Sequence, residues 1–348
     1  MAAAVRDTAE AEIKAIGMDI VYNCDEKFIG YAAVSIVSLL ENNREEPDIH
    51  IHILSNGISS ASMERLSAMA ASYEAEDRRR SLSFLDIGDM EEMLRQRTGT
   101  EVSVGRFSYT ALGRIFASEL IKEVSRLLYI DSDTLVLGGL SELYGLSLSG
   151  CLAAMAIEPT IYSEVKIAAG LSEEEPYFNS GVILMDAEGL RREHMAEKAV
   201  SYIRSSSGSF SFADQDILNH VLRGRVKVMP QRFNFFSGYY YRSYESLIRL
   251  YPGFSEGGAK EDFKAAKKRP VIVHFAGDER PWIEGNFCPY RRKYRSYKAL
   301  TPWRDEPDIK GRRAYMLFYH MVNLATAMAP GLRELISKAY YQMKVRKS

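Results

Sequence analysis

The stretch that decides the fold is Arg126-Leu-Leu-Tyr-Ile-Asp-Ser-Asp-Thr-Leu-Val-Leu137. Its apolar run, 127–130, predicts a buried β-strand that ends in two carboxylates, Asp131 and Asp133. Two buried carboxylates are unfavourable side by side, because like charges raise each other's pKa and burial adds a desolvation cost. A hard divalent cation with oxygen ligands removes this conflict and can also hold the phosphates of a nucleotide. The stretch therefore predicts a site for a metal ion and a diphosphate.

Two other interpretations of Asp131-Ser132-Asp133 stay open. Asp and Ser are also ordinary turn residues at the end of a strand, because their side chains satisfy loop backbone. An Asp-x-Asp pattern also occurs in phosphatases of the haloacid dehalogenase type, where Asp131 would be the nucleophile. In that pattern a Thr or Val follows two positions after the second aspartate, whereas Thr134 comes one position early. The stretch also lies in the middle of the chain and not after a first strand. We therefore favour the phosphatase interpretation less, but it stays open.

Strand and helix patterns alternate upstream of this stretch. Strand patterns cover 18–25, 48–54 and 81–86, and helical patterns cover 28–40 and 59–73. This alternation predicts an α/β fold with a mostly parallel sheet and right-handed crossovers. Ligands of such sheets bind beyond the carboxyl ends of the strands, so we expect Asp25 to lie near the aspartate pair. No Gly-x-Gly-x-x-Gly loop follows the first strand, which favours a metal ion as the holder of phosphates.

Two stretches further along place polar residues where a ligand can be held. A helical pattern over 109–120 carries Arg114, which could pair with Glu119 on the same helix. A later strand pattern contains Asn179 and Gly181 near its start. A glycine within a strand indicates close approach of a ligand or another part of the chain, and Asn179 can hydrogen-bond sugar hydroxyls.

The remaining candidates lie in the last third of the main domain. The stretch 212–219 opens a helix, for which Asp214 is a natural N-cap. Gln215 and Asp216 would lie in its first turn, where either can face a ligand. A short apolar strand ends at His274. A single histidine there is more often structural, but the two distant carboxylates make it a candidate third metal ligand.

Length and charge divide the chain into three parts. The 348 residues are 46% hydrophobic and 26% charged, which suits one large globular α/β domain with a small appendage. The net charge of −1 does not suggest a nucleic-acid partner. Residues 291–348, however, hold 14 Lys and Arg against 4 Asp and Glu. We therefore predict a leading helix (1–17), a main domain (18–290) and a basic, largely helical segment (291–348).

The basic segment predicts an anionic partner, either a phospholipid surface or an anionic glycan, and the alternative is a solvated helical face. The chain has three cysteines without metal-binding spacing, which fits a reducing compartment. Residues 1–17 lack the apolar core of a signal peptide, and no run of 18 purely apolar residues exists. We expect a cytoplasmic protein, peripherally associated at most with the inner face of the membrane.

Several motifs now occur in a specific order. They are Asn23-Cys24-Asp25, Arg114 ahead of Tyr129-Ile-Asp-Ser-Asp133, Phe178-Asn-Ser-Gly181, Asp214-Gln-Asp-Ile-Leu218, and His274-Phe-Ala-Gly277 with Arg280-Pro-Trp282. Through them the chain resembles glycosyltransferase family 8, the retaining, metal-dependent group that includes bacterial lipopolysaccharide galactosyl- and glucosyltransferases and glycogenin. The resemblance covers about Met18 to Trp303. It implies that the main domain is a catalytic domain of the GT-A fold, an α/β sandwich around a mostly parallel sheet.

The resemblance also implies a role for each candidate residue. The family's Mn²⁺ ligands, which could also hold Mg²⁺, match Asp131, Asp133 and His274. Contacts with the UDP part of the donor match Asn23, Cys24, Asp25, Phe28 and Ser132. Contacts with the donor sugar match Arg114 and Asn179, and Glu158 stands where an acidic residue can border the sugars. The diphosphate-binding turn matches Gly277 and Arg280, where the family often has Lys. The pair beside the reacting sugar carbon matches Asp214 and Gln215.

These roles predict a hexosyltransferase that moves galactose or glucose from UDP-hexose to a glycan or lipid-linked saccharide. A divalent ion and Arg280 would stabilise the negative charge that develops on departing UDP. An oxygen of Gln215 or Asp216 could stabilise the oxocarbenium-like carbon. We favour front-side attack, since the amide of Gln215 is a poor nucleophile, and a covalent route through Asp216 is the alternative. A non-catalytic nucleotide-sugar binding protein is the remaining alternative.

Overall fold

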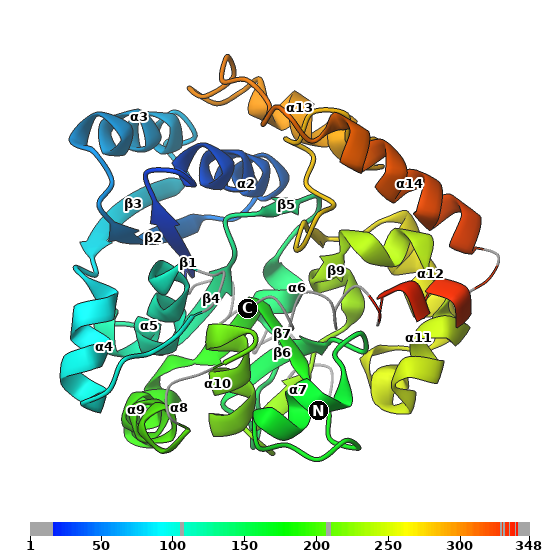
Figure 1. Cartoon of the computed structure of the whole chain (residues 1–348). Coiled ribbons are helices and arrows are strands. Elements are labelled where there is room, and N and C mark those ends of the chain that lie inside the picture. The colour runs from blue at the N-terminus through cyan, green and yellow to red at the C-terminus, as the bar shows by residue number, and fades with distance from the viewer. Residues whose placement is uncertain are drawn as a thin grey trace, which may run out of the picture.

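The computed structural model describes residues 17–104, 108–206 and 210–327, together with 329, 331–333, 335–337 and 339. In this part of the chain a seven-stranded sheet has the order β3-β2-β1-β4-β7-β6-β8 (Figure 1). Its strands are β1 (Met18–Asp25), β2 (Asp48–Asn56), β3 (Arg79–Asp86), β4 (Arg126–Ile130), β6 (Ala153–Ile157), β7 (Phe178–Asp186) and β8 (Val226–Val228). Neighbouring strands are parallel except β7, which runs antiparallel to both β4 and β6. The predicted mostly parallel α/β sheet is confirmed, and the predicted leading helix lies outside the described residues.

Helices cover both faces of the sheet, because alternate side chains of each central strand point to opposite faces. In β1, Ile20 and Tyr22 join one core cluster, whereas Val21 joins the cluster on the other face. The first cluster packs under α2 (Ile29–Asn42) and α3 (Ser60–Ala71). The second packs against α4 (Met90–Thr98), α9 (Met195–Ser205) and α10 (Ala213–Val221). Figure 1 shows these two helical layers on either side of the strands.

The other helical segments are shorter or lie at the periphery. The α-helices among them are α5 (Ala117–Leu120), α6 (Ser141–Tyr144), α7 (Ser163–Ala168), α8 (Ala187–Arg192), α11 (Tyr244–Leu250), α12 (Lys260–Lys268), α13 (Arg291–Lys298) and α14 (Arg313–Ala327). The 3-10 helices are η1 (Tyr109–Phe116), η2 (Gln231–Phe233), η3 (Ser237–Tyr241) and η4 (Pro252–Gly257). The helix expected over 109–120 is therefore mostly a 3-10 helix that continues into one α-helical turn.

A second, three-stranded sheet brings distant parts of the chain to the end of β4. It contains β5 (Thr134–Val136), β9 (Phe235–Phe236) and β10 (Ile272–His274) in the order β5-β10-β9. β5 and β10 are antiparallel, and their register sets His274 opposite Thr134. The histidine consequently lies next to the aspartate pair, although the two are far apart in the sequence.

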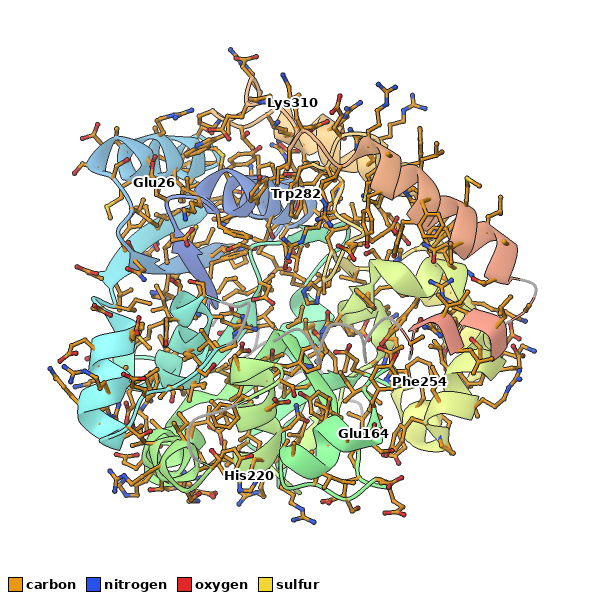
Figure 2. The ribbon with its side chains drawn as sticks, viewed as in Figure 1. Glu26, Glu164, His220, Phe254, Trp282 and Lys310 are labelled. Carbon is orange, nitrogen blue, oxygen red and sulfur yellow. The ribbon has the colours of Figure 1, made fainter. Side chains whose placement is uncertain are left out.

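The C-terminal helices pack on the rest of the fold through a third hydrophobic cluster. Tyr294 of α13 and Met316 of α14 share it with Phe275 and Trp282 (Figure 2 labels Trp282). Trp282 also stacks on Tyr31 of α2 with ring centroids 4.3 Å apart. The boundary at residue 290 remains a prediction. Among the described helices, none is long and apolar enough to cross a bilayer.

Candidate active site

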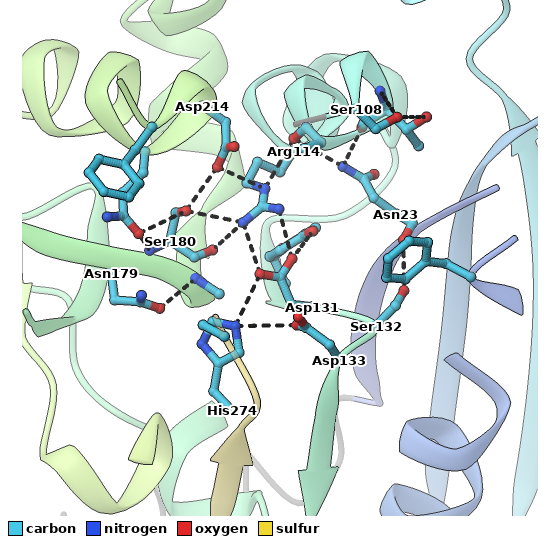
Figure 3. Close-up of a pocket in the computed structure, with 18 of the residues that line it drawn as sticks. Asn23, Ser108, Arg114, Asp131, Ser132, Asp133, Asn179, Ser180, Asp214 and His274 are labelled. Atoms are coloured by element: carbon cyan, nitrogen blue, oxygen red, sulfur yellow. Dashed lines mark hydrogen bonds and ion pairs between the residues drawn. The ribbon is translucent and has the colours of Figure 1, made fainter. Parts of the chain in front are cut away.

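A pocket of about 620 Å³ opens at the carboxyl ends of β1 and β4 (Figure 3). Nearly all the residues singled out in the sequence line it: Asn23, Cys24, Asp25, Phe28, Arg114, Asp131, Ser132, Asp133, Glu158, Asn179, Asp214, Gln215, His274, Gly277 and Arg280. The parallel pairing of β1 with β4 explains why Asp25 and the aspartate pair share one edge of the sheet.

Two carboxylates and one imidazole meet at the floor of this pocket. His274 Nε2 lies 3.5 Å from an Asp131 oxygen and 3.3 Å from an Asp133 oxygen. One potential ligand atom from each of the three side chains lies within 4.8 Å of the others. No second group of this kind, with three or more His, Cys, Asp or Glu residues, occurs in the described chain. The expected meeting of these three side chains is therefore observed.

Neighbouring residues orient the imidazole so that Nε2 faces the carboxylates. On its other side, His274 Nδ1 lies 3.1 Å from Asn234 Oδ1, and the Asn234 amide donates to Asn179 Oδ1 at 2.8 Å. The ring also lies directly against Gly181, where an added Cβ would sit 2.1 Å from His274 Cε1. The close approach expected at this glycine is made by the histidine ring.

Arg114 links the cluster of Asp131, Asp133 and His274 to the start of α10. Its guanidinium contacts Asp131 at 2.7 Å and Asp214 at 3.2 Å, and it donates to the Ser180 carbonyl at 2.8 Å. The same group lies over the ring of Tyr129, 4.6 Å from the centroid. The expected pairing of Arg114 with Glu119 is wrong, because η1 turns the arginine inward, and Glu119 pairs with Arg97 instead.

Charge is distributed unevenly in the site. Burial favours a neutral Asp133, but the hydrogen bond and charge of His274 outweigh it and hold the Asp133 pKa at about 2. Burial likewise opposes a charged His274, but Asp133 and Asp131 raise its pKa above the usual value. Burial raises the pKa of Asp214 to about 6 against the pull of Arg114. The Asp133 carboxylate is therefore ionised and is stabilised by the positive charge next to it.

Asp214 and Gln215 face the pocket from the first turn of α10. Asp214 does not cap the helix as expected, since its carboxylate accepts a hydrogen bond from Ser180 Oγ at 2.8 Å and pairs with Arg114. Gln215 Oε1 accepts from the Ser180 amide at 3.0 Å, and its Nε2 donates to Glu158 at 3.3 Å. Glu158 also accepts from Asn179 at 2.8 Å.

Asp216 is not among the described residues that line the pocket. It is buried behind Gln215, where Tyr177 Oη donates to one oxygen at 2.5 Å and the Phe212 amide donates to the other at 2.8 Å. Both oxygens are therefore engaged in holding the start of α10. This placement gives no support to the covalent route through Asp216.

The opposite wall of the pocket is formed by the end of β1 and the turn after β10. Asn23 is fixed by a hydrogen bond to the Thr110 carbonyl, 3.0 Å, and its own carbonyl accepts from Ser132 Oγ at 2.7 Å. Arg280 Nη2 approaches Asp133 at 3.4 Å, and its buried Nε has no hydrogen-bond partner among the described residues. That guanidinium is well placed to meet an anionic ligand.

Sequence reasoning missed several residues of the site. Tyr129 Oη donates to Asp131 at 2.6 Å, Asn234 fixes the His274 ring, and Lys27 lines the pocket. Tyr129 could have been found, because it stands two positions before Asp131 and so shares its face of the strand. Asn234 carries no such signal, since it reaches the site only through the pairing of β9 with β10.

The three clustered side chains fit a divalent cation. Carboxylate oxygens suit Mn²⁺ and Mg²⁺, and the neutral imidazole of histidine is a common ligand of transition metals. The hydrogen bond from Nδ1 to Asn234 selects the tautomer with Nε2 free for an ion, as is usual for metal-binding histidines. Tyr129 and Arg114 orient Asp131 in the same way.

Comparisons with known proteins agree with this geometry. The family model described as Glycosyl transferase family 8 matches residues 19–285. General stress protein A of Bacillus subtilis (strain 168) is 27% identical over 291 residues, which cover 82% of this chain and 94% of that protein. A lipopolysaccharide 1,2-glucosyltransferase of Escherichia coli (strain K12) is 24% identical over 317 residues, which cover 87% and 86%.

The fold is also that of solved glycosyltransferases. The crystal structure of the galactosyltransferase LgtC in complex with donor and acceptor sugar analogs matches with a TM-score of 0.65 at 21% identity. The match covers 82% of this chain and 99% of that one. The expected GT-A fold is therefore confirmed.

Proposed function

Because the chain belongs to glycosyltransferase family 8 and is a hexosyltransferase, we propose that it moves galactose or glucose from UDP-hexose to a glycan or lipid-linked saccharide, with retention of configuration. The observation that carries this proposal is the meeting of Asp131, Asp133 and His274 at the floor of the pocket. Membership in a transferase family removes the reason to retain the phosphatase and binding-protein alternatives.

The proposed ion is Mn²⁺ or Mg²⁺, held by the two aspartates and the histidine. When bound, it supplies positive charge that stabilises the developing charge on the leaving diphosphate. Arg280 would add a fixed cation and hydrogen-bond donors beside it, which favours the transition state over the bound donor. The place of Arg280 and Gly277 in the pocket lining and the left-handed backbone of Gly277, with φ of 80°, support this assignment.

We assign the UDP part of the donor to the wall formed by the end of β1. Asn23, Cys24, Asp25 and Ser132 offer backbone and side-chain polar groups there, and Phe28 offers a ring to cover the base. The Asp25 carboxylate accepts a hydrogen bond from the Phe28 amide at 3.0 Å, which fixes this loop. On the sugar side, Asn179 and Arg114 are pre-oriented by Glu158 and Asp131 respectively.

We assign the reacting carbon to the space in front of Gln215 and Asp214. The Gln215 carbonyl oxygen can stabilise positive character on that carbon, and its orientation is fixed by the Ser180 amide. In front-side attack, an oxygen of the departing phosphate accepts the proton of the acceptor hydroxyl as the new glycosidic bond forms. No side chain then has to act as the base.

A screen of UDP-sugars with Mn²⁺ tests the proposal. We expect UDP-galactose or UDP-glucose to bind with Mn²⁺, to be hydrolysed slowly to UDP without acceptor, and to lose both properties in EDTA. His274→Ala should abolish the Mn²⁺ dependence, and the matched control His50→Ala should not, because His50 bonds Ser81 on the far strands. UDP affinity that is equal with and without chelator would refute the proposal.

We also propose that the protein is cytoplasmic and attaches peripherally to an anionic membrane through α14. The outward face of this helix exposes four apolar side chains: Leu317 (53%), Phe318 (63%), Met321 (60%) and Leu324 (76%). Exposed Arg313 begins the same helix, and exposed Arg312 directly precedes it. Basic residues near an anionic surface contribute roughly 1 kcal/mol each, and the apolar face adds insertion energy.

Sedimentation with lipid vesicles tests this attachment. We expect binding to vesicles that contain anionic lipid, weaker binding to neutral vesicles, and loss of binding in Phe318→Ser/Leu324→Ser. Ser149→Ala is the control variant and should bind as the wild type does, because Ser149 lies on an exposed loop far from α14 in the sequence. Equal sedimentation of the double variant and the wild type would show that α14 does not insert.

A further inference from the structure

The turn that follows β10 carries groups with opposite orientations. Gly277 and Arg280 line the pocket, whereas Asp278 and Glu279 between them do not. Glu279 is only 1% exposed. The two acidic side chains must therefore have partners on the side of the turn away from the pocket.

For Asp278 the partners are at the start of α14. Tyr315 Oη donates to one carboxylate oxygen at 2.8 Å, and Arg312 Nη2 approaches the other at 3.3 Å. The half-buried Asp278 carboxylate is thus held by one hydroxyl donor and one guanidinium donor, which leaves it little freedom to rotate. The Asp278 backbone is consequently tied to the helix.

Glu279 has partners on η3 (Ser237–Tyr241) and on α14. Tyr241 Oη donates to its carboxyl at 3.3 Å, and the Tyr319 hydroxyl interacts with the same group. Tyr241 Oη is also 3.2 Å from His320 Nδ1. Two tyrosine hydroxyl groups thus contact Glu279: that of Tyr319 belongs to α14, and that of Tyr241 contacts α14 through His320.

Arg280 is tied to the same helix through one intermediate residue. Asn286 Nδ2 donates to the Arg280 carbonyl at 2.6 Å, and Asn286 Oδ1 lies 2.7 Å from His320 Nε2. Three consecutive residues of the turn are therefore connected to α14, and Met316 packs in the core cluster with Phe275 and Trp282 at the two ends of the turn.

From these contacts we propose that α14 is a positioning element for the diphosphate-binding turn, with Tyr315, Tyr319 and His320 as positioning residues that act through Arg280. This inference rests on the proposed function, since the ligand of Arg280 is taken to be a nucleoside diphosphate. The inward face of α14 then sets affinity for the leaving group, while its outward face, with Phe318 and Leu324, takes no part in donor binding.

Calorimetric titration of the full-length protein with UDP in the presence of Mn²⁺ tests the proposal. We expect Tyr315→Phe to weaken UDP binding by at least about fivefold, the lower end of typical coupling between sites. Asp278→Asn should act similarly and replaces Tyr315→Phe if that variant does not fold. In donor hydrolysis, kcat should fall by more than KM rises, because Arg280 acts on the negative charge that develops as UDP departs.

Two comparisons separate positioning from a general loss of structure. Phe318→Ala, next to Tyr319 but on the exposed face, should leave the UDP affinity unchanged. In an Arg280→Ala background, Tyr315→Phe should change the UDP affinity no further. Three results would each overturn the inference. Phe318→Ala could weaken UDP binding as much as Tyr315→Phe does, or Tyr315→Phe could weaken it as much in the Arg280→Ala background as in the wild type. The third is wild-type UDP affinity in both Tyr315→Phe and Asp278→Asn. A wild type without Mn²⁺-dependent UDP binding would overturn the proposed function and this inference together.

Discussion

Replacement of Gly181 by alanine should displace His274, the proposed third metal ligand, without altering any charged group. The added Cβ would lie 2.1 Å from His274 Cε1 and 2.5 Å from Nδ1. Carbon atoms pack at about 3.5 Å, so the ring must retreat by about 1.4 Å or the strand must shift. Either movement also strains the hydrogen bond from Nδ1 to Asn234.

The displacement is large compared with what a metal site tolerates. Ligand distances in such sites hold to roughly 0.2 Å, and a misplacement of about 1 Å at a catalytic group can cost about 100-fold in rate. We expect Gly181→Ala to lower kcat/KM for donor hydrolysis about 100-fold and to raise the Mn²⁺ concentration for half-maximal activity at least about tenfold. Overpacking should cost about 1–3 kcal/mol of stability, visible as a lower Tm in a folded protein.

The assay is UDP release from UDP-sugar over a Mn²⁺ titration, with thermal melts of each variant. Gly139→Ala is the matched control, because a Cβ there meets no atom within 4 Å. In a His274→Ala background the clash disappears, so Gly181→Ala should add almost no further loss. A Gly181→Ala enzyme with the wild-type Mn²⁺ dependence and Tm would refute the position assigned to the imidazole.

Three further predictions concern the groups around this cluster. Asn234→Ala should weaken Mn²⁺ binding by about 10–100-fold, because it frees the His274 ring; calorimetric titration with Mn²⁺ checks this, and unchanged affinity contradicts it. Arg114→Lys should lower kcat by about 10²–10³-fold, because an ammonium cannot reach both Asp131 and Asp214 as the guanidinium does; steady-state kinetics check this, and a wild-type kcat refutes it. Burial raises the pKa of Glu279 from its ordinary 4.5 to about 7, against hydrogen bonds from Tyr319 and Tyr241 and the charge of Arg333. The folded protein therefore keeps a proton that the unfolded chain releases, so stability should fall as the pH rises from about 4.5 to 7, and Glu279→Gln should flatten this change in melts across that range.

The main sheet and the two aspartates could be predicted because they depend on local patterns. The apolar run 127–130 and the alternation around it require only a strand and its neighbours. Even so, the antiparallel direction of β7 could not be seen, because a buried strand has the same apolar pattern in either direction.

The features of the site that could not be predicted from the sequence depend on contacts between residues that are distant in the chain. Arg114 turns toward Asp131 and Asp214 because η1 packs against the start of α10, and no spacing in the sequence encodes that packing. Asn234 and the links from α14 to the turn after β10 arise in the same way. Asp214 is a residue type that often caps helices, but α10 begins one residue before it, with Phe212 in the N-cap position, and the Asp214 carboxylate pairs with the buried Arg114.

The antiparallel pairing of β5 with β10 has a consequence for synthesis of the protein. Asp131 and Asp133 leave the ribosome long before His274, and the histidine reaches them only after β10 has added to β5. A nascent or prematurely terminated chain thus exposes an incomplete set of ligands, with which tight ion uptake is not expected. The three-residue cluster is therefore completed late in synthesis, by a strand made more than 130 residues after the aspartates.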